Sequence, residues 1–223
     1  MSTKNNIINS SIKFFLIYGY DNTSLNMIAK DIGIKKPSLY HHFKNKEELF
    51  KIDFEYIINS LLDKIKLAAN LKLDPKYMLE NLISGLIEYN LNLSLSLKLD
   101  PNKLVDISSF FSSSINKFPE LQVLVDSYYD FLKLSLVKII RSGQRSGIII
   151  KDLDREMSSY IIISTIEGLF TLSTIYSKFN ITVYRQRIFE NMWKSLTYNN
   201  SKSNKSLFKK KAKSKTLSIG TKW

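Results

Sequence analysis

The sequence predicts an all-α protein, and three observations lead to that prediction. The 223-residue chain contains only 7 Gly and 4 Pro, which argues against a turn-rich all-β design. Apolar residues recur at helical spacing, and Pro75, Pro101 and Pro119 each stand where the first turn of a helix would begin. Hydrophobic residues make up 44% and charged residues 24%, values typical of a globular protein long enough to bury a core.

The N-terminal region predicts a first helix over residues 4–18, because apolar side chains fall near one helical face and Gly19 then ends the run. Thr23 and Ser24 are cap-type residues ahead of a second, short helix that Gly33 ends. The glycine-containing break that follows is short. This arrangement is the first part of a helix-turn-helix unit.

The next segment supplies the remaining helices of that unit. Pro37 fits the first turn of a helix, where a missing N–H costs nothing, and this helix is predicted to run through "PSLYHHF". Asn45 then begins a new helix as its N-cap, with Glu48 as capping-box partner, and this helix is predicted to reach about residue 72. Three helices in this order predict a helix-turn-helix domain over residues 1–50.

The rest of the chain to residue 198 reads as a second helical domain, 51–198. Its further helices are predicted over residues 75–97, 102–116, 119–143, 154–176 and 181–198. Residues 91–99 alternate Leu with polar residues, the period of a strand, but they are kept helical because no partner strand is evident. Residues 157–176 carry one charge in twenty. An acidic residue near their centre costs roughly 2.5 to 3.5 kcal/mol in a bilayer and cancels the apolar gain, so an interface helix is favoured over a membrane span.

Positive charge is concentrated at the two ends of the chain. The net charge is +13, and the eight lysines and no acids of residues 199–223 leave +5 for the remainder. This tail is predicted to be disordered, either as a solvated segment or as an addition to nonspecific DNA affinity. A basic chain suggests a phosphate-bearing partner, but charge alone does not separate nucleic acid from lipid.

Few residues are suited to catalysis or to metal binding. The chain has no cysteine, which fits a reducing cytoplasm, and its two histidines are adjacent at His41 and His42. Adjacent residues of a helix point about 100° apart, and no further ligand or catalytic partner is evident. We therefore expect no metal, no cofactor and no enzymatic activity. A membrane-associated or protein-interaction module remains the alternative to DNA binding.

Residues 35–46 carry the groups that a DNA-reading helix needs. Lysines and a serine at its start can reach phosphates or base edges, while tyrosine and histidine can donate to phosphate oxygens. The competing interpretations are a solvated lysine face and an aromatic prop for the helix. The predicted DNA contacts are Thr23, Ser24, Lys35, Lys36, Pro37, Ser38, Tyr40, His41, His42 and Lys46.

The stretch "GYDNTSLNMIAKDIGIKKPSLYHHFKNKEELF" resembles the DNA-binding signature of the TetR family of transcriptional repressors. The matching positions are Phe15, Gly19, Tyr20, Thr23, Ser24, Ile28, Ala29, Gly33, Leu39, Tyr40, His42, Phe43, Lys46, Glu47 and Leu49. Downstream, Phe-Pro, Gly-Gln, Asp-Leu-Asp and Glu-Gly-Leu follow a looser family pattern. Lys35 and Pro37 depart from the usual residues at the start of the recognition helix, which affects the expected base preference. Ser10 and Ser11 replace the usual small apolar residues.

The resemblance implies an all-α homodimer that binds operator DNA, with an effector pocket among the middle helices and a four-helix bundle made by the last two helices of each chain. Aromatic residues suited to the pocket, or alternatively to the core, are Tyr89, Phe110, Phe111, Tyr128 and Tyr129. Residues expected at the dimer interface, or alternatively in the chain's own core, are Tyr160, Ile161, Ser164, Gly168, Leu172, Phe189, Met192, Trp193 and Leu196.

Overall fold

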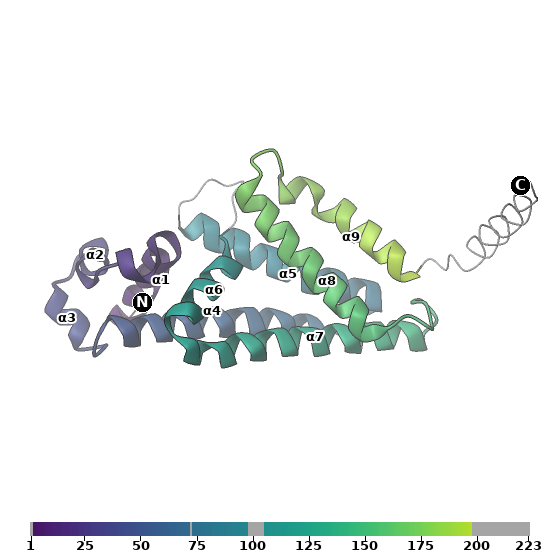
Figure 1. Ribbon diagram of the computed structural model, residues 1–223, viewed down its shortest axis with the longest axis horizontal. Helices are drawn as coiled ribbons and strands as arrows, with labels where there is room; N and C mark the ends of the chain where they lie inside the picture. Colours follow the sequence, from purple (N-terminus) through teal and green to yellow (C-terminus); the bar gives the residue numbers. More distant parts are fainter. Residues whose placement is uncertain (1, 72, 98–104, 198–223) are drawn as a thin grey trace, which may run out of the picture.

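The computed structural model describes residues 2–71, 73–97 and 105–197, and within these ranges the regular elements are all helices, as predicted. Figure 1 shows an elongated molecule with α1 to α3 at one end and α8 and α9 toward the other. The elements are α1 (Thr3–Asn22), α2 (Leu25–Asp31), α3 (Lys36–Tyr40), α4 (Lys46–Ala69), α5 (Pro75–Ser96), α6 (Ile107–Lys117), the 3-10 turn η1 (Pro119–Leu121), α7 (Gln122–Arg145), α8 (Arg155–Ile175) and α9 (Ile181–Thr197). The lysine-rich tail lies outside the described residues.

Helices α1 to α3 and the start of α4 form a small head. The backbone of α1 leaves helical geometry at Gly19, where φ is 74°, so the predicted end is confirmed at that residue even though a last turn follows. The hydroxyl of Ser11 donates back to the Ile7 carbonyl oxygen at 2.8 Å, which satisfies this buried serine inside its own helix. The head closes around a shared core of Ile7, Phe15, Ile28, Leu39, Phe43 and Phe50.

Helix α4 joins the head to the other helices, which together form the body. The side chain of Asn45 accepts from the Glu48 N–H at 2.8 Å, which confirms the predicted N-cap. The Glu48 carboxylate accepts from the N–H of Lys44 instead of that of Asn45, so the reciprocal bond falls one residue earlier than in a standard capping box. The 24 residues of α4 span about 36 Å at a rise of 1.5 Å per residue. Its buried face therefore extends from the head into the middle of the body.

The helices after α5 depart from the sequence prediction at two starts. Residues 105 and 106 are not helical, and α6 begins at Ile107 with the Asp106 side chain capping the Ser109 N–H at 2.8 Å. The prediction that this helix begins at residue 102 is therefore wrong. Pro119 begins a 3-10 turn that precedes α7, and α7 continues to Arg145. The strand-like segment is helical as far as Ser96, as predicted.

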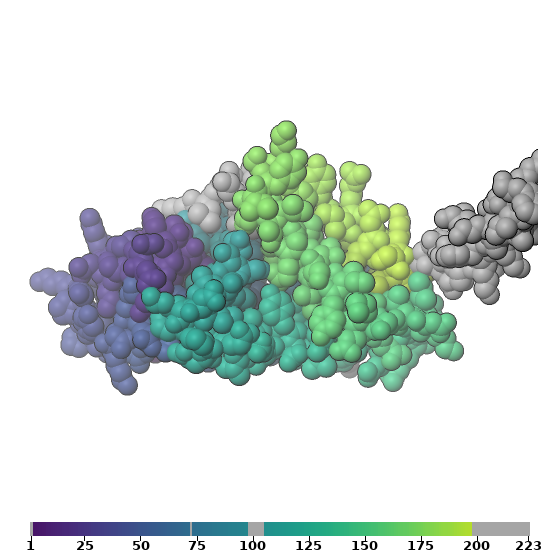
Figure 2. Space-filling model, viewed as in Figure 1, coloured from purple at the N-terminus to yellow at the C-terminus, as the bar shows by residue number. Residues whose placement is uncertain are grey.

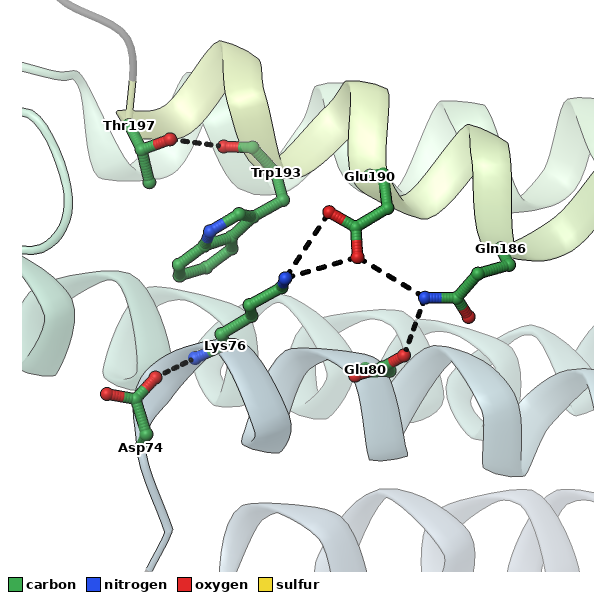
Figure 3. Close-up of polar contacts among 7 residues, drawn as sticks. All are labelled: Asp74, Lys76, Glu80, Gln186, Glu190, Trp193 and Thr197. Atoms are coloured by element: carbon green, nitrogen blue, oxygen red, sulfur yellow. Dashed lines mark hydrogen bonds and ion pairs between the residues drawn. The ribbon is translucent and has the colours of Figure 1, made fainter.

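Helix α9 is fixed against α5 by a polar cluster that Figure 3 shows in close-up. The Lys76 ammonium lies 3.1 Å from the Glu190 carboxylate, and the Gln186 amide donates to Glu80 at 3.1 Å and to Glu190 at 3.3 Å. Trp193 points from α9 toward α5 on the same side as Glu190 (Figure 3), so these contacts border the buried face of α9.

Candidate nucleic-acid interface

Helix α3 lies at the tip of the head, at the end of the molecule remote from α9 (Figure 1). Leu39 and Phe43 are buried, at 1% and 3% exposure, and fix α3 on the head core. Tyr40, on the other side of the helix, is 49% exposed, and Lys35 and Lys36 are also exposed. The buried pair thus holds a short, rigid helix whose outward face carries positive charge and a phenol.

The start of α3 is built without a side-chain cap. Lys35 occupies the N-cap position in an extended conformation, and its side chain makes no capping hydrogen bond. Pro37 lies in the first turn, where its missing N–H leaves nothing unsatisfied. The half-buried Ser38 donates its backbone N–H to the Lys35 carbonyl oxygen at 2.9 Å. The Lys36 ammonium lies 5.9 Å from the centre of the Tyr40 ring, so these two predicted contacts share one side of α3.

Both histidines lie just beyond α3 and are exposed. The helix ends at Tyr40, so the prediction that it continues through His41 and His42 is wrong. The His42 ring is 6.4 Å from that of the buried Phe43, which orients the turn. Among the described residues, no group of three or more His, Cys, Asp or Glu side chains is placed to hold a metal ion.

Of the two cap-type residues before α2, only Ser24 has its side chain at the surface. Its hydroxyl accepts from the Met27 N–H at 3.2 Å, while Thr23 is 1% exposed. The Thr23 hydroxyl lies within hydrogen-bond distance of the Phe14 carbonyl oxygen at 3.0 Å and the Gly19 carbonyl oxygen at 2.8 Å. The predicted phosphate contact by the Thr23 side chain is corrected, because this hydroxyl is buried and used to hold the end of α1.

Lys46 also points inward, which corrects its prediction as a DNA contact at the start of α4. Its ammonium donates to the carbonyl oxygens of Tyr20 at 2.6 Å and Thr23 at 2.7 Å. Partial burial, aided by the nearby Lys117 charge and opposed by Asp21, lowers the pKa of Lys46. The lysine therefore binds the C-terminal end of α1 to the N-terminal end of α4.

The head meets the body at Tyr20, a junction that sequence reasoning did not identify. The Tyr20 ring makes edge contacts with Phe50 at 5.1 Å and with Phe118, just before η1, at 4.9 Å. An ion pair of 2.6 Å joins Asp21 of α1 to Lys117 of α6. Burial, followed by the charge of Glu47, raises the pKa of Tyr20. The only sequence signal was that Tyr20 and the Phe-Pro pair both match family positions.

The five aromatic residues predicted for an effector pocket do not line one cavity. Tyr89 lies in a cleft beside α1, and Phe110 borders another cleft near Tyr20. Phe111, Tyr128 and Tyr129 meet around a space of only about 10 Å³. That volume holds no more than one water molecule, so the predicted pocket is closed in this conformation.

The closed space has a carboxylate at its edge that the sequence analysis did not select. Glu167 of α8 accepts from the Tyr129 hydroxyl at 3.2 Å and from the Ser108 hydroxyl. Burial raises the pKa of Glu167, and these two hydroxyls partly oppose the rise. The result is a polar anchor among apolar walls, made by α6, α7 and α8.

The predicted dimer-interface residues separate by helix. Those of α8 face outward, with Ile161 58% and Leu172 42% exposed and open space around Gly168. Those of α9 face inward, because Phe189, Trp193 and Leu196 are each no more than 8% exposed and Met192 is partly buried. The chain's own core takes these α9 side chains, which corrects their predicted role. In Figure 2 the α8 segment, in green, stands out on the visible face.

Helix α8 is also the helix, within the described part of the chain, that is long and apolar enough to cross a membrane by length and composition. Its mean hydropathy over the most apolar window is 1.2, and 39% of that window is buried. Core helices of soluble proteins have the same properties. Most of the rest of α8 is exposed, and exposed apolar surface is typical of interaction sites.

Comparisons with known proteins agree with the geometry of the head. Residues 7–51 match the family model described as "Bacterial regulatory proteins, tetR family". IcaR of Staphylococcus epidermidis, a negative transcriptional regulator of the biofilm operon icaADBC, is 43% identical over 60 residues, which are 27% of this chain and 32% of that relative. IcaR of Staphylococcus aureus is 29% identical over 147 residues, covering 60% of this chain and 78% of the relative.

The likeness in fold extends over the body as well. A transcriptional regulator from Saccharomonospora viridis, solved in complex with choline, superposes with a TM-score of 0.71 at 16% identity, covering 88% of this chain and 98% of that one. The helix-turn-helix head is thus matched in sequence and the remaining helices in fold. The head is therefore similar in sequence to the bacterial regulatory proteins of the tetR family, and the body shares its fold with a solved transcriptional regulator.

Proposed function

We propose that the protein is a repressor that binds a two-fold-symmetric operator through α3 and is released by a small-molecule effector. The observation that carries the DNA-binding role is the outward face of α3, with Lys35, Lys36 and Tyr40 exposed above the buried Leu39. Such a helix fits the major groove, and the flanking Ser24 and the two histidines stand where phosphates would pass. The similarity to IcaR, a negative regulator, supports repression.

Footprinting on the DNA that flanks the protein's own coding region tests this proposal. The matched pair is a Lys36→Ala, Tyr40→Ala variant against a Lys138→Ala, Tyr77→Ala control, which removes an exposed lysine and an exposed tyrosine of the body. We expect a discrete symmetric footprint for the native protein and the control, and none for the α3 variant. A footprint that the α3 variant retains would refute the assignment of α3 to DNA.

The outward face of α8 is proposed as the homodimer interface. Its exposed apolar residues form one stripe, which is more than a soluble monomer normally leaves uncovered. The stripe consists of Met157, Tyr160, Ile161, Ser164, Gly168, Leu172 and Ile175. A dimer would place the two α3 helices for successive major grooves, about 34 Å apart. A cytoplasmic location follows from this reading.

The effector is proposed to enter between α6, α7 and α8, beside Phe111, Tyr128, Tyr129 and Glu167. Because the space there is about 10 Å³, binding requires the aromatic side chains or α6 to move. Helix α6 is tied to the head by the Lys117–Asp21 ion pair, so its displacement would change the orientation of the head. Solution binding of candidate effectors to Tyr129→Ala and native protein, compared with their effect on operator affinity, tests this route.

The domain division follows from the same proposal. Residues 1–50 would serve as the DNA-binding unit and 51–198 as the regulatory and dimerisation unit, with α4 common to both. The predicted addition of nonspecific DNA affinity by residues 199–223 concerns a segment outside the described residues. Deleting that segment should flatten the salt dependence of DNA binding. Without its eight lysines the protein neutralises fewer phosphates and so releases fewer counterions from the DNA.

A further inference from the structure

A second hollow lies between the head and the body, separate from the closed space at Glu167. It is a cleft of about 670 Å³ whose walls come from α1 and the end of α2 on one side and from α4 and α5 on the other. Its volume falls within the range of small-molecule sites, about 300 to 1,000 Å³. Of the five residues predicted for the effector pocket, Tyr89 alone lines this cleft.

The walls of the cleft offer uncharged hydrogen-bonding groups from opposite sides. Asn6 and Asn9 of α1 face the cleft from the head, and Asn92 of α5 faces it from the body. In the part of the chain that the structure describes, none of these three side-chain amides hydrogen-bonds another residue. Each amide offers two donors and an acceptor, so the three together can bind a ligand rich in hydroxyl or amide groups.

Two tyrosines add ring surface to these amides. Tyr56 of α4 is 51% exposed, and Tyr89 of α5 is half-buried beside it. Burial raises the pKa of Tyr89 to about 12, and the neighbouring Ser60 hydroxyl opposes the rise, so the phenol is a neutral donor at any physiological pH. Tyrosine rings give large contact area at low entropic cost, and their polar tips remain available.

The charged groups of the cleft neutralise each other. The Lys13 ammonium lies 3.1 Å from the Asp31 carboxylate, which also accepts from the buried Ser10 hydroxyl at 2.7 Å. A charged ligand would have to break this arrangement, whereas an apolar ligand would leave the three asparagine amides without partners. The chemistry of the lining therefore favours a neutral polar ligand.

We propose that the cleft between α1 and α5 binds a neutral, hydroxyl-rich ring compound of the glycoside class, with its ring against Tyr56 and Tyr89 and its hydroxyls on Asn6, Asn9 and Asn92. Such a ligand contacts the head and the body at once. It therefore binds best at one orientation of the head and shifts the population toward it. This regulatory consequence, unlike the binding site itself, rests on the proposed operator function.

The binding site is tested by titrating the full-length protein with 4-nitrophenyl β-glucoside in the absence of DNA, followed by calorimetry or ligand-observed NMR. Three proteins are compared, namely the native chain, Tyr56→Ala and Tyr77→Ala. Tyr77 is a matched control, because it is 57% exposed on α5 and does not line the cleft. We expect saturable binding that Tyr56→Ala weakens about tenfold and Tyr77→Ala leaves unchanged. Asn9→Ala, an exposed substitution in α1, should weaken it as well.

Three results would overturn the assignment. The first is the absence of saturable binding up to about 10 mM, and the second is equal binding by the three proteins. The third is tighter binding of 4-nitrophenyl phosphate than of the glucoside, which would show that the site selects an anion. The proposed operator function is tested independently of this site, because the footprinting experiment contains no glucoside. If the glycoside site and the operator function are both correct, the two bindings should be linked. The factor by which the glucoside changes the affinity for operator DNA should then equal the factor by which operator DNA changes the affinity for the glucoside.

Discussion

The ammonium of Lys46 lies 2.6 Å from the carbonyl oxygen of Tyr20 and 4.1 Å from the centre of the Tyr20 ring. One side chain at the start of α4 thus binds the last turn of α1 and also covers the ring that meets the body. A cation at the C-terminal end of a helix is favourable, because the unpaired carbonyls there carry partial negative charge. Lys46 therefore belongs to the junction that sets the orientation of the head.

Replacing Lys46 by Met should destabilise the protein. We expect a loss of about 1 to 2 kcal/mol in the free energy of unfolding, because two charge-assisted hydrogen bonds disappear and only part of the site is shielded from water. Urea denaturation measures the change. Lys44→Met, at an exposed neighbouring position, is the control and should have little effect. Equal stabilities for the two variants would mean that the Lys46 contacts contribute nothing to folding.

Asp53 of α4 is buried without a hydrogen-bond partner for either carboxylate oxygen among the described residues. Burial raises its pKa well above 3.8, with the adjacent Ser11 hydroxyl opposing the rise. Because the folded state holds this proton more tightly, stability is full below the unfolded pKa and is lost as pH rises through the folded pKa.

Replacing Asp53 by Asn should therefore stabilise the protein at neutral pH, by about 1 to 3 kcal/mol, and reduce the loss of stability above about pH 4. Thermal denaturation from pH 4 to 8 measures both effects. Asp63→Asn, on the exposed side of α4 at 67% side-chain exposure, is the control and should leave the profile unchanged. A native-like pH profile in the Asp53 variant would show that another group causes the dependence.

The features that were predictable from sequence are those set by local chemistry. The end of regular helix at Gly19 and the cap at Asn45 depend on residues within one or two turns, and both are confirmed. The start of α6 depends on a distant residue, because the Asn90 side chain bonds the Val105 N–H at 2.9 Å and its carbonyl oxygen at 3.1 Å. No local pattern contains that contact.

The same distinction explains the errors in the candidate sites. Helical spacing identified an apolar face on α9, but spacing does not say whether the partner of Trp193 is another chain or, as found, the chain's own core. Lys46 was predicted to contact DNA, because the carbonyls of Tyr20 and Thr23 that accept from its ammonium are far away in the sequence. The sequence analysis used Glu167 only as part of the Glu-Gly-Leu pattern. Its role as a hydrogen-bond acceptor was not predictable, because its partners Ser108 and Tyr129 come from other helices.

Glu167 should tolerate loss of charge better than loss of its oxygens. Glu167→Gln keeps an acceptor for the hydroxyls of Ser108 and Tyr129, whereas Glu167→Ala leaves both partly buried hydroxyls without this acceptor. We expect the Ala variant to be less stable than the Gln variant by about 1 to 3 kcal/mol in thermal denaturation. Glu55→Ala, on the exposed face of α4, should match the native protein. Equal losses for Gln and Ala would show that the charge, not the hydrogen bonding, matters.

A charge on the outward face of α8 should dissociate the proposed dimer. Ile161→Asp places a carboxylate in the apolar stripe, where burial against a second copy would cost several kcal/mol. Sedimentation velocity should then give the mass of one chain, 25.9 kDa, instead of twice that value. Val123→Asp, at a position 63% exposed on α7, is the control and should leave the mass unchanged. An Ile161→Asp protein that remains dimeric would assign the interface to another surface.

The turn after α7 packs tightly against Gly143 and leaves no room for a larger residue at that position. Its carbonyl oxygen accepts from the N–H groups of Ile148 at 2.9 Å and Ile149 at 3.0 Å. A Cβ at Gly143 would lie 2.5 Å from Cδ1 and 2.6 Å from Cγ1 of Ile149, which is 2% exposed and cannot move aside freely. The methyl group of alanine therefore forces either the helix or the loop to shift.

Gly143→Ala should cost about 1 to 3 kcal/mol, although alanine is the better helix former. Gly85→Ala is the matched control in the middle of α5, where the nearest atom would be 3.9 Å away, and it should stabilise the protein by up to about 1 kcal/mol. Ile149→Ala removes the clashing atoms but itself destabilises the protein. In a double-mutant cycle, the double variant should therefore lose less free energy of unfolding than the sum of the losses of the two single variants. Strict additivity would mean that Gly143 and Ile149 do not compete for the same space.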